Sequence, residues 1–399
     1  MVKEIAIWLY LFYFKLQFAF CKLFPVRKNK VTFVVSFGDN SVFLYEELKK
    51  LQPDSHIVFL AAKKAFPKLQ PYQSSAKLIT FENSIMSMAR SAYHLATSRV
   101  VLVDNYFGFL SVTNFKKETE CIQLWHAAGA IKTFGLKDES ISFRSRRAHK
   151  RFLHVYKNFH KVVVGSDAMA DIFKEAFQLS SANFLRTGVP RTDLFFSGNR
   201  TKAVKEKLYQ ENTVLKDKKV ILYAPTYRDD QLDEFELQLD LDMLQRELGA
   251  EYVLLIRSHP VLKNKINVEE QYPGFAFDYS TGSDINEILL ITDILISDYS
   301  SIPYEFSLLN RPMIFYPYDL KEYSKTRGLW DSYEKLVPGP IVFDSLEMVK
   351  VIKEKGYDMN KVQQFSAMWN QYHFGHSSRL LAEYILETER ERNVNASGS

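Results

Sequence analysis

Short, nearly continuous apolar runs alternate along most of the chain with longer segments whose apolar residues recur at helical spacing. In the first half these runs lie at residues 31–37, 56–62, 77–81, 99–106, 121–126, 161–165 and 184–187. Strands that are buried on both faces of a parallel sheet have continuous apolar runs rather than strict alternation. The helical segments between the runs indicate βαβ units, so the first half predicts a doubly wound α/β domain.

The pattern pauses at the polar, charged residues 197–218 and then resumes. The runs of the second half lie at 219–224, 252–257, 275–279, 294–297, 313–316 and 341–343. We therefore predict two doubly wound Rossmann-like α/β domains that face each other across a cleft, at residues 29–200 and 201–378, with a helix end and a disordered tail over 379–399. Ligands of open α/β sheets bind beyond the carboxyl ends of the strands, so the cleft is the expected site.

The N-terminal residues 5–24 are apolar and aromatic, but polar residues interrupt them. A membrane-spanning helix needs about 20 mostly apolar residues, whereas the uninterrupted run covers only 5–14, and no small-residue cleavage site follows it. The pattern favours an amphipathic interfacial membrane helix over residues 1–28; a single spanning anchor and a helix packed on the protein's own core stay open. The expected lipid contacts are Trp8, Phe12, Lys15 and Lys22.

The two halves of the chain carry opposite net charge. Residues 1–200 contain 29 Lys and Arg against 15 Asp and Glu, a net +14, whereas residues 201–399 contain 23 against 32, a net −9. The first half is therefore expected to meet an anionic partner such as a membrane, a lipid diphosphate or a nucleic acid. Basic stripes interleaved with aromatic residues for base stacking are absent from the sequence, which argues against nucleic acid.

The sequence gives no sign of a bound metal, a cofactor or a disulfide framework. Cys21 and Cys121 are its only cysteines, and no Cys/His cluster has zinc spacing, as in a protein of a reducing cytosol. It has neither a GxGxxG nor a GxxxxGK[ST] loop. Its one D-x-D, at Asp240 and Asp242, reads as a solvated helix face. We therefore expect a reaction that needs no metal.

Two candidate segments end strands of the first half. In LWHAAGAIK, His126 follows a strand and precedes small residues, with Lys132 beyond them. A histidine here suits a general base because its pKa lies near neutrality, and a buried core histidine is an equal alternative. The segment RTGVPRTD offers Arg191 for bidentate phosphate contact, against the alternative of a linker with solvated charges.

Three further segments end strands of the second half. APTYRD offers Thr226 and Arg228, and RSHP offers Arg257 and His259. In SDYSSIPYE a strand runs into a helix that has proline in its first turn. Backbone N–H groups and hydroxyls at such a helix start can bind an anion, although an ordinary serine N-cap has the same pattern. Its candidate residues are Asp298, Ser300, Ser301 and Glu305.

In this order, the five segments resemble the CDP-glycerol glycerophosphotransferase family of wall teichoic acid synthesis. The segments RGLWDSY and PGP extend the resemblance, which covers about residues 30–378. It implies a two-domain GT-B fold, CDP-glycerol as donor, and neither cofactor nor metal in the transfer step. The short chain, with its predicted N-terminal membrane helix, is most similar to the primase type of this family.

The resemblance also implies residue roles. His126 matches the base that deprotonates the acceptor hydroxyl, although Ala127 stands where family members more often have glycine. His259 matches a histidine that holds the donor diphosphate, and Ser300 with Ser301 matches a phosphate cradle. Arg191, Arg228 and Arg327 match positions near the donor or acceptor phosphates.

The implied reaction transfers glycerol phosphate from CDP-glycerol to an undecaprenyl-diphosphate-linked disaccharide and releases CMP. The basic run 144–151, with Arg146 and Arg147, fits the acceptor diphosphate or an anionic membrane surface. The expected location is peripheral, on the cytoplasmic face of the cell membrane, and other teichoic acid enzymes are further candidate partners.

Three alternatives to this reading stay open. The first is a short glycerol- or ribitol-phosphate polymerase or second-step transferase, and the second is a GT-B glycosyltransferase that uses a nucleotide sugar. The third is a non-catalytic binding protein that uses the basic half of the chain, which would leave His126 and His259 unexplained.

Overall fold

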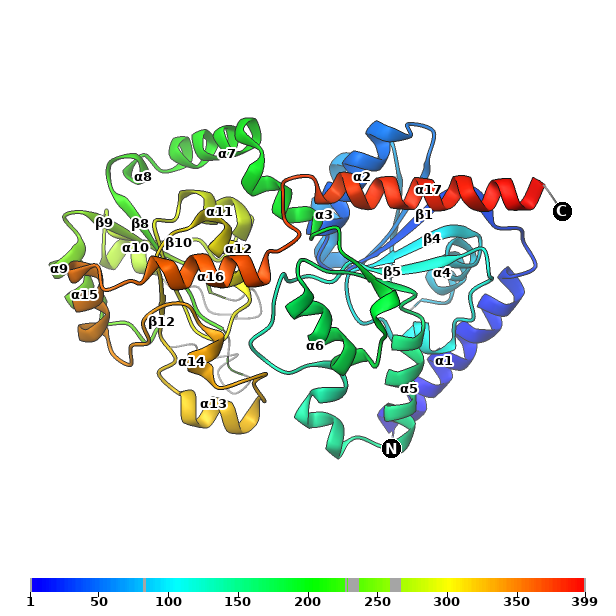
Figure 1. Cartoon of the computed structure of the whole chain (residues 1–399), viewed down its shortest axis with the longest axis horizontal. Helices are drawn as coiled ribbons and strands as arrows, with labels where there is room; N and C mark the ends of the chain where they lie inside the picture. Colours follow the sequence, from blue (N-terminus) through cyan, green and yellow to red (C-terminus); the bar gives the residue numbers. More distant parts are fainter. Residues whose placement is uncertain (1, 82–83, 227, 229–236, 259–266, 398–399) are drawn as a thin grey trace. The chain divides into compact units, whose positions relative to one another are not determined.

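The computed structural model describes residues 2–81, 84–226, 228, 237–258 and 267–397. The chain divides into two compact units (Figure 1). Unit 1 comprises Met1–His126, Phe134–Asp193 and Tyr372–Ser399, and unit 2 comprises Ala127–Thr133 and Leu194–Gln371. Each unit contains one parallel sheet, so the predicted α/β fold with two parallel sheets is confirmed.

The sheet of unit 1 has seven parallel strands in the order β3-β2-β1-β4-β5-β6-β7. The chain runs outward from β1 to one edge, returns to β4 beside β1, and then runs to the other edge. Ligand sites in such sheets lie where this order reverses, here between β1 and β4. The strands are β1 (Arg27–Val35), β2 (His56–Ala61), β3 (Lys77–Thr80), β4 (Ser98–Val103), β5 (Glu120–Gln123), β6 (Lys161–Val163) and β7 (Phe184–Leu185).

Helices cover both faces of this sheet (Figure 1). They are α1 (Val2–Cys21), α2 (Asp39–Leu51), α3 (Phe66–Leu69), α4 (Ile85–Ala96), α5 (Arg146–Lys157), α6 (Asp167–Phe177) and α17 (Ser377–Ser397). The C-terminal α17 packs along α2. Residues 372–378, which the sequence pattern assigned to the second domain, therefore belong to unit 1.

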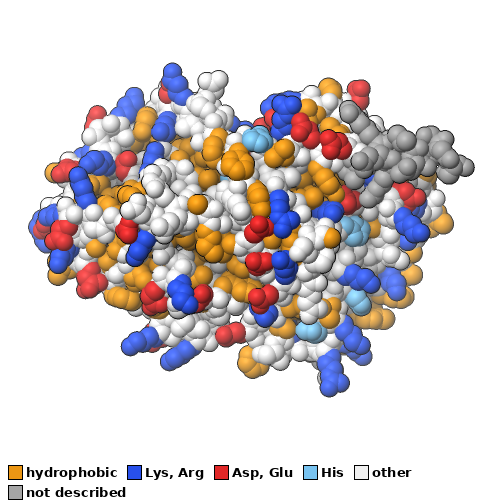
Figure 2. Space-filling model, in the orientation of Figure 1, with side chains coloured by type: hydrophobic (Ala, Val, Ile, Leu, Met, Phe, Trp, Pro, Cys, Tyr) orange, Lys and Arg blue, Asp and Glu red, His pale blue; other side chains and the backbone are white. Residues whose placement is uncertain are grey.

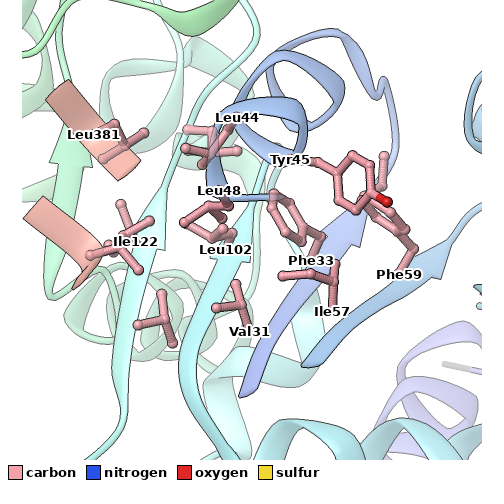
Figure 3. Packing of buried hydrophobic residues seen from close by; sticks show 14 of the residues in the cluster. Val31, Phe33, Leu44, Tyr45, Leu48, Ile57, Phe59, Leu102, Ile122 and Leu381 are labelled. Atoms are coloured by element: carbon pink, nitrogen blue, oxygen red, sulfur yellow. The ribbon is translucent and has the colours of Figure 1, made fainter. Parts of the chain in front are cut away.

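The core of unit 1 explains why α17 returns to it. Figure 3 shows side chains of α2 and the central strands pointing toward one another, with Leu381 of α17 beside them. The rings of Phe33 and Phe59 lie 5.0 Å apart, and that of Tyr45 lies 5.3 Å from Phe59. Leu381 and Ile385 are fully buried. Burial of such side chains contributes roughly 1.5–3 kcal/mol each, so the helix is anchored by its apolar face.

Helix α1 has two different apolar faces. One is buried against α4 and the 3-10 turn η3 (Gly108–Val112), as the core-packing alternative predicted, and consists of Leu11, Phe14, Phe18 and Cys21. The opposite face is between 48% and 62% exposed and consists of Ile5, Trp8, Leu9, Phe12, Leu16 and Phe20. By length and composition the window Glu4–Cys21 is also apolar enough to cross a membrane. Although α1 packs one apolar face on the protein, its second apolar face stays exposed.

The sheet of unit 2 has five parallel strands in the order β10-β9-β8-β11-β12, which reverses between β8 and β11. The strands are β8 (Lys219–Ala224), β9 (Tyr252–Ile256), β10 (Ala276–Asp278), β11 (Ile294–Ser297) and β12 (Met313–Phe315). The predicted strand at 341–343 is reduced to a single bridge between Ile341 and Phe315. The prolines at 338 and 340 have no N–H to donate, which prevents a longer ladder there.

The helices of unit 2 range from four residues in α8 to 14 residues in α7. They are α7 (Gly198–Glu211), α8 (Val214–Asp217), α9 (Leu241–Leu248), α10 (Val268–Gln271), α11 (Ile285–Ile291), α12 (Ile302–Phe306), α13 (Leu320–Thr326), α14 (Tyr333–Leu336), α15 (Ser345–Glu354) and α16 (Met359–Trp369). Of these, α12 is the helix that comes after β11, from which only residues 298–301 separate it, so it starts near the carboxyl edge of the sheet.

Candidate active site

A buried carboxylate organises the carboxyl edge of the unit 1 sheet. Asp104 follows β4 directly and accepts hydrogen bonds from the N–H groups of Ser36, Phe37 and Gly38, at 2.8, 2.8 and 3.1 Å. These three residues form the turn between β1 and α2. Burial raises the pKa of Asp104 to about 6, although the three N–H groups oppose that shift. Asp104 is thus ionised at neutral pH and fixes the turn at the point where the strand order reverses.

His126 lies three residues beyond the end of β5, half-buried between two aromatic rings. Its imidazole stacks on Phe37 and Trp125, each at a centroid distance of 4.5 Å. Its Nδ1 lies 3.3 Å from the backbone oxygen of Asp104. A carbonyl oxygen only accepts, so this bond requires the proton on Nδ1 and leaves Nε2 as an acceptor in the neutral ring.

The electrostatic surroundings keep this imidazole neutral. Burial, together with the positive charges of Arg191 and Lys64, lowers the pKa of His126 to about 4, and the hydrogen bond to Asp104 opposes that shift. The ring is therefore unprotonated at neutral pH, as a proton acceptor must be. An anionic ligand near Arg191 would offset that charge and raise the pKa of His126 towards the range of an effective base.

The turn that presents His126 has an unusual backbone. Trp125 has a φ of 56°, in the left-handed region that costs a bulky residue conformational energy. Its N–H donates to Oε1 of Gln123 at 2.9 Å, and its carbonyl accepts from Nδ2 of Asn40 at 2.9 Å. Asn40 Oδ1 also accepts from the N–H of Arg191 at 3.1 Å. The buried Asn40 therefore ties the His126 turn to the segment that carries Arg191.

The segment after His126 is held within unit 2. The N–H of Ala128 donates to Oε1 of Glu305 in α12 at 3.0 Å. Gly129 lies against the ring of Tyr304, so closely that a Cβ would lie 2.1 Å from it. Glu305, a predicted substrate ligand, is thus buried and binds the backbone of Ala128. The close packing of Gly129 on Tyr304 explains why this part of LWHAAGAIK has small residues.

Lys132 continues this segment in a short antiparallel pairing with the RGLW segment. It forms a bridge with Leu329. The N–H of Thr133 donates to the Gly328 oxygen at 2.8 Å, and the N–H of Trp330 donates to the Ile131 oxygen at 3.1 Å. Two segments that the sequence singled out therefore meet in space.

The carboxyl edge of the unit 2 sheet repeats the arrangement of unit 1. Asp298 follows β11 directly, is 1% exposed, and accepts from the N–H of Thr226 at 2.8 Å and of Tyr299 at 2.6 Å. Burial raises its pKa, and the charge of Arg228 opposes that shift. We predicted Asp298 as a substrate ligand, but its oxygens hold the loop after β8.

Arg228, a predicted phosphate ligand, is engaged within unit 2. Its Nε and Nη2 donate to the two oxygens of Asp319 at 2.6 and 2.8 Å, and its Nη1 lies 3.1 Å from Oδ2 of Asp298. Its guanidinium also lies about 5 Å from three tyrosine ring centres, at 5.1, 5.0 and 4.8 Å from Tyr299, Tyr318 and Tyr323. The side chain of Arg228 thus supports this edge of the sheet, because its Nε and Nη2 are already bound to the two oxygens of the Asp319 carboxylate.

Hydroxyl groups at the same edge have unused hydrogen-bonding capacity. The Oγ of Ser258, which follows β9, is buried and has no hydrogen-bond partner among the described residues. Ser301 is the N-cap residue of α12, yet its side chain makes no cap hydrogen bond, whereas Ser300 Oγ accepts from the N–H of Ile302 at 3.2 Å. A buried hydroxyl without a protein partner is a position where a polar ligand can bind.

The remaining predicted ligands have other positions. Arg257 donates to the backbone oxygens of Tyr279 and Ser283 at 2.5 and 2.8 Å and so anchors a loop. Arg327 is exposed at the end of α13. His259 lies outside the described residues. Within the described part of the chain, no group of three or more His, Cys, Asp or Glu residues could hold a metal ion.

Asp104, Asn40 and Asp319 organise these edges, and the sequence analysis did not single them out. Asp104 had a signal, because it follows an apolar run directly, as Asp298 does. The partners of Asn40 and Asp319 lie 85 and 91 residues away in the chain, so no local pattern points to them.

Comparisons with known proteins agree on one family. The family model described as CDP-Glycerol:Poly(glycerophosphate) glycerophosphotransferase matches residues 16–387. The chain is 37% identical to a teichoic acid glycerol-phosphate primase of Bacillus spizizenii, over 90% of this chain and 92% of that protein. It is 35% identical to a teichoic acid poly(ribitol-phosphate) polymerase of the same species, over 94% of this chain but 58% of that protein.

A solved structure has the same fold. The wall teichoic acid polymerase TagF superimposes with a TM-score of 0.79 at 27% sequence identity, over 98% of this chain and 96% of that one. The family match covers most of the chain, including every segment on which the resemblance was based. The chain therefore belongs to the CDP-glycerol:poly(glycerophosphate) glycerophosphotransferase family.

Proposed function

We propose that the chain is a glycerol-phosphate primase, which transfers glycerol phosphate from CDP-glycerol to a lipid-diphosphate-linked disaccharide and releases CMP. Membership of the family makes it a glycerophosphotransferase. The primase assignment is supported by 37% and 35% identity to two teichoic acid glycerol-phosphate primases, over 92% and 96% of their lengths.

In the proposed reaction an acceptor hydroxyl attacks the β-phosphorus of CDP-glycerol. A new P–O bond forms to the acceptor, the bond between that phosphorus and the oxygen bridging to CMP breaks, and CMP leaves with the bonding electrons. The hydroxyl proton passes to His126 Nε2. Enzymatic phosphoryl transfer is mainly positioning and charge stabilisation, so one base and a set of polar donors are sufficient protein groups.

The observation that carries this proposal is the state of His126. Its Nδ1 faces a carbonyl that can only accept, and its lowered pKa keeps the ring neutral. Nε2 is thereby left as a proton acceptor.

For the donor we propose the carboxyl edge of the unit 2 sheet. The support is the hydroxyl of Ser258, buried without a partner among the described residues, and the uncapped side chain of Ser301. Arg228 is proposed to hold this edge rigid through Asp319 rather than to bind the diphosphate. No metal is part of the proposal, so activity should survive chelation by EDTA, and a loss restored by Mg²⁺ would contradict this.

The test is an assay with purified protein, CDP-glycerol and a synthetic lipid-diphosphate disaccharide. The expected product has gained one glycerol phosphate by mass, with one CMP released per product. Products with many added units would identify a polymerase. Turnover of a nucleotide sugar or CDP-ribitol in preference to CDP-glycerol would overturn the donor assignment.

We further propose that unit 1 binds the cytoplasmic membrane surface peripherally. The exposed apolar stripe of α1 lies beside α5, and a cavity of about 840 Å³ between them is lined by Ile5, Trp8 and Leu11 and by Arg147, Lys150 and Arg151. Figure 2 shows Lys, Arg and His side chains where Figure 1 places α5. An apolar stripe with adjacent cations suits an anionic lipid surface.

Vesicle sedimentation tests this placement. Trp8→Ser with Phe12→Ser should release the protein from anionic vesicles, because both side chains are about half exposed on the stripe. The matched control is Leu346→Ser, which removes an equally exposed apolar side chain from unit 2. Equal binding by the double variant and the control would contradict the proposal.

A further inference from the structure

We propose that a cavity of unit 1 beside His126 binds a sugar ring of the acceptor, an inference that rests on the function proposed above. The cavity has a volume of about 220 Å³ and lies between α5, α6 and the ends of β4 and β5. Its walls are aromatic and its opening is polar. Ligand sites combine these features, with an apolar lining and a few polar groups that set orientation.

One wall of this cavity, here called the indole wall, is formed by Trp125, Phe134 and Phe177. The Trp125 ring lies 4.8 Å from Phe134 and 5.5 Å from Phe177. Phe177 is buried in α6, whereas Trp125 and Phe134 are half-buried. The wall is thus supported from behind and open in front.

The other wall, here called the tyrosine wall, is formed by Tyr106, Phe152 and Tyr156. The Tyr106 ring lies 5.3 Å from Phe152 and 6.1 Å from Tyr156. The two walls meet at the base of the cavity, where the rings of Tyr156 and Phe177 lie 4.6 Å apart. A slot with aromatic rings on both sides matches a pyranose, whose C–H faces are apolar and whose edge carries hydroxyls.

The rim of the cavity offers hydrogen-bonding groups for such an edge. Asp138 accepts from the N–H of Ser140 at 2.9 Å, and Arg144 lies 3.5 Å from the Ser140 hydroxyl and 5.6 Å from the centre of the Phe152 ring. A carboxylate, a hydroxyl and a guanidinium together suit a polyhydroxylated ligand. They do not suit a hydrocarbon tail, which would have to desolvate them without replacing their hydrogen bonds.

The position of the cavity connects it to the proposed chemistry. Trp125 belongs to the indole wall and also stacks on His126 at 4.5 Å. The same indole therefore lines the slot and contacts His126, and it belongs to a residue with a left-handed φ of 56°. A sugar in the slot would place one of its hydroxyls near the imidazole of His126, with the isoprenoid chain farther away.

The experiment uses the full-length protein with Phe152→Ala, which opens the tyrosine wall without touching Trp125 or His126. Acceptors are soluble lipid-diphosphate disaccharides with two different short isoprenoid lengths. KM for both acceptors should rise by about tenfold or more, while the Kd for CDP-glycerol is unchanged. Phe374→Ala, which removes an exposed ring elsewhere in unit 1, is the matched control and should change neither value.

The outcomes separate the sugar from other occupants. A KM increase that grows with isoprenoid length would assign the slot to the tail and overturn the inference. An unchanged KM in a variant that folds and binds CDP-glycerol normally would also overturn it, while leaving the transferase function intact.

Failure of the proposed function would give a different result, namely no turnover of these acceptors by the wild-type protein. Binding of the free disaccharide, followed by tryptophan fluorescence, then decides the inference by itself. Quenching that Phe152→Ala abolishes supports the sugar slot, and the absence of any binding to the wild type overturns it.

Discussion

The two units place an aspartate at the same point of the same topology and surround it differently. Asp104 follows β4 and Asp298 follows β11, each where the strand order reverses, and each binds backbone N–H groups of the loop after the first strand. In unit 2 a buried arginine adjoins that aspartate, with Asp319 as a second carboxylate. In unit 1 the neighbour is a neutral histidine that contacts the backbone of Asp104.

The two units also differ in the charge of their other buried basic side chains. Unit 1 buries Lys30, His94 and His373, and His126 is half-buried. Burial lowers the pKa of Lys30 to about 7 and the pKa of His94 and of His373 to about 3. Unit 2 buries Arg228, whose pKa stays raised because carboxylates hold its charge. A buried base whose pKa is lowered makes the fold less stable in acid, whereas removing the arginine from a buried ion pair leaves carboxylates without their cation.

The largest expected effect comes from breaking that support. Arg228→Met should destabilise the protein by about 3–5 kcal/mol, because it leaves the carboxylates of Asp298 and Asp319 without their cation. Urea unfolding measures this, and Arg246→Met, which removes an exposed arginine of unit 2, should change little. Normal stability with a loss of CDP-glycerol binding would instead restore Arg228 as a phosphate ligand.

Acidification should act on unit 1 first. Below pH 6.5, His94 and His373 take up protons in the unfolded chain but stay neutral in the folded protein, where the pKa of each is about 3. The free energy of unfolding therefore falls as the pH drops from 6.5 towards 3. Each contributes a loss on the order of 3 kcal/mol at pH 4. Asp104, with its pKa raised to about 6, acts in the opposite sense and offsets part of this. Hydrogen exchange at pH 4–5 should expose β1–β7 before β8–β12; the reverse order would refute the comparison.

The segment that follows His126, the proposed base, should tolerate no added atom. Gly129→Ala would place a Cβ 2.1 Å from the Tyr304 ring and displace the Ala127–Thr133 segment. A shift of about 1 Å near reacting groups can reduce kcat by on the order of 100-fold. Gly198→Ala is the matched control in unit 2, because nothing lies within 4 Å of its Cβ. Equal activity of both variants would show that this packing does not position His126.

The smallest effect concerns Asn40, a positioning residue. Asn40→Ala removes the bonds that join the Trp125 carbonyl to the N–H of Arg191, so kcat should fall by about tenfold. KM for CDP-glycerol should stay constant, and Asn40→Asp, which keeps only the acceptor for Arg191, should recover part of the loss. A change in KM with constant kcat would indicate a donor-binding role instead.

The sequence predicted the strands and the segments that end them because buried parallel strands have a local signature. The apolar run before Asp104 and the one before Asp298 are visible in the chain, so both edges could be located. The side chains that bind residues at those edges could not be predicted, because they come from distant parts of the chain. Asp319 lies 91 residues from Arg228, and Asn40 lies 85 residues from Trp125. The sequence therefore predicts Arg228 as a phosphate ligand, whereas in the structure its guanidinium is bound to Asp298 and Asp319.

The N-terminal helix shows the same limit of local patterns. Its sequence favours an interfacial helix, with core packing as one alternative. In the structure Phe14 and Phe18 pack on the protein while Trp8 and Phe12 stay exposed. Only the packing partners, α4 and η3, decide which apolar stripe is covered, and they lie elsewhere in the sequence.

The central claim is that unit 1 supplies the base and unit 2 binds the donor. Calorimetry with CDP-glycerol, combined with turnover, tests it on His126→Asn and on Ser258→Ala with Ser301→Ala. His126→Asn should bind CDP-glycerol like the wild type and lose roughly 10²–10⁴-fold in kcat. The serine variant should bind CDP-glycerol more weakly and keep kcat closer to normal. Loss of donor binding in His126→Asn, with normal binding in the serine variant, would contradict the account.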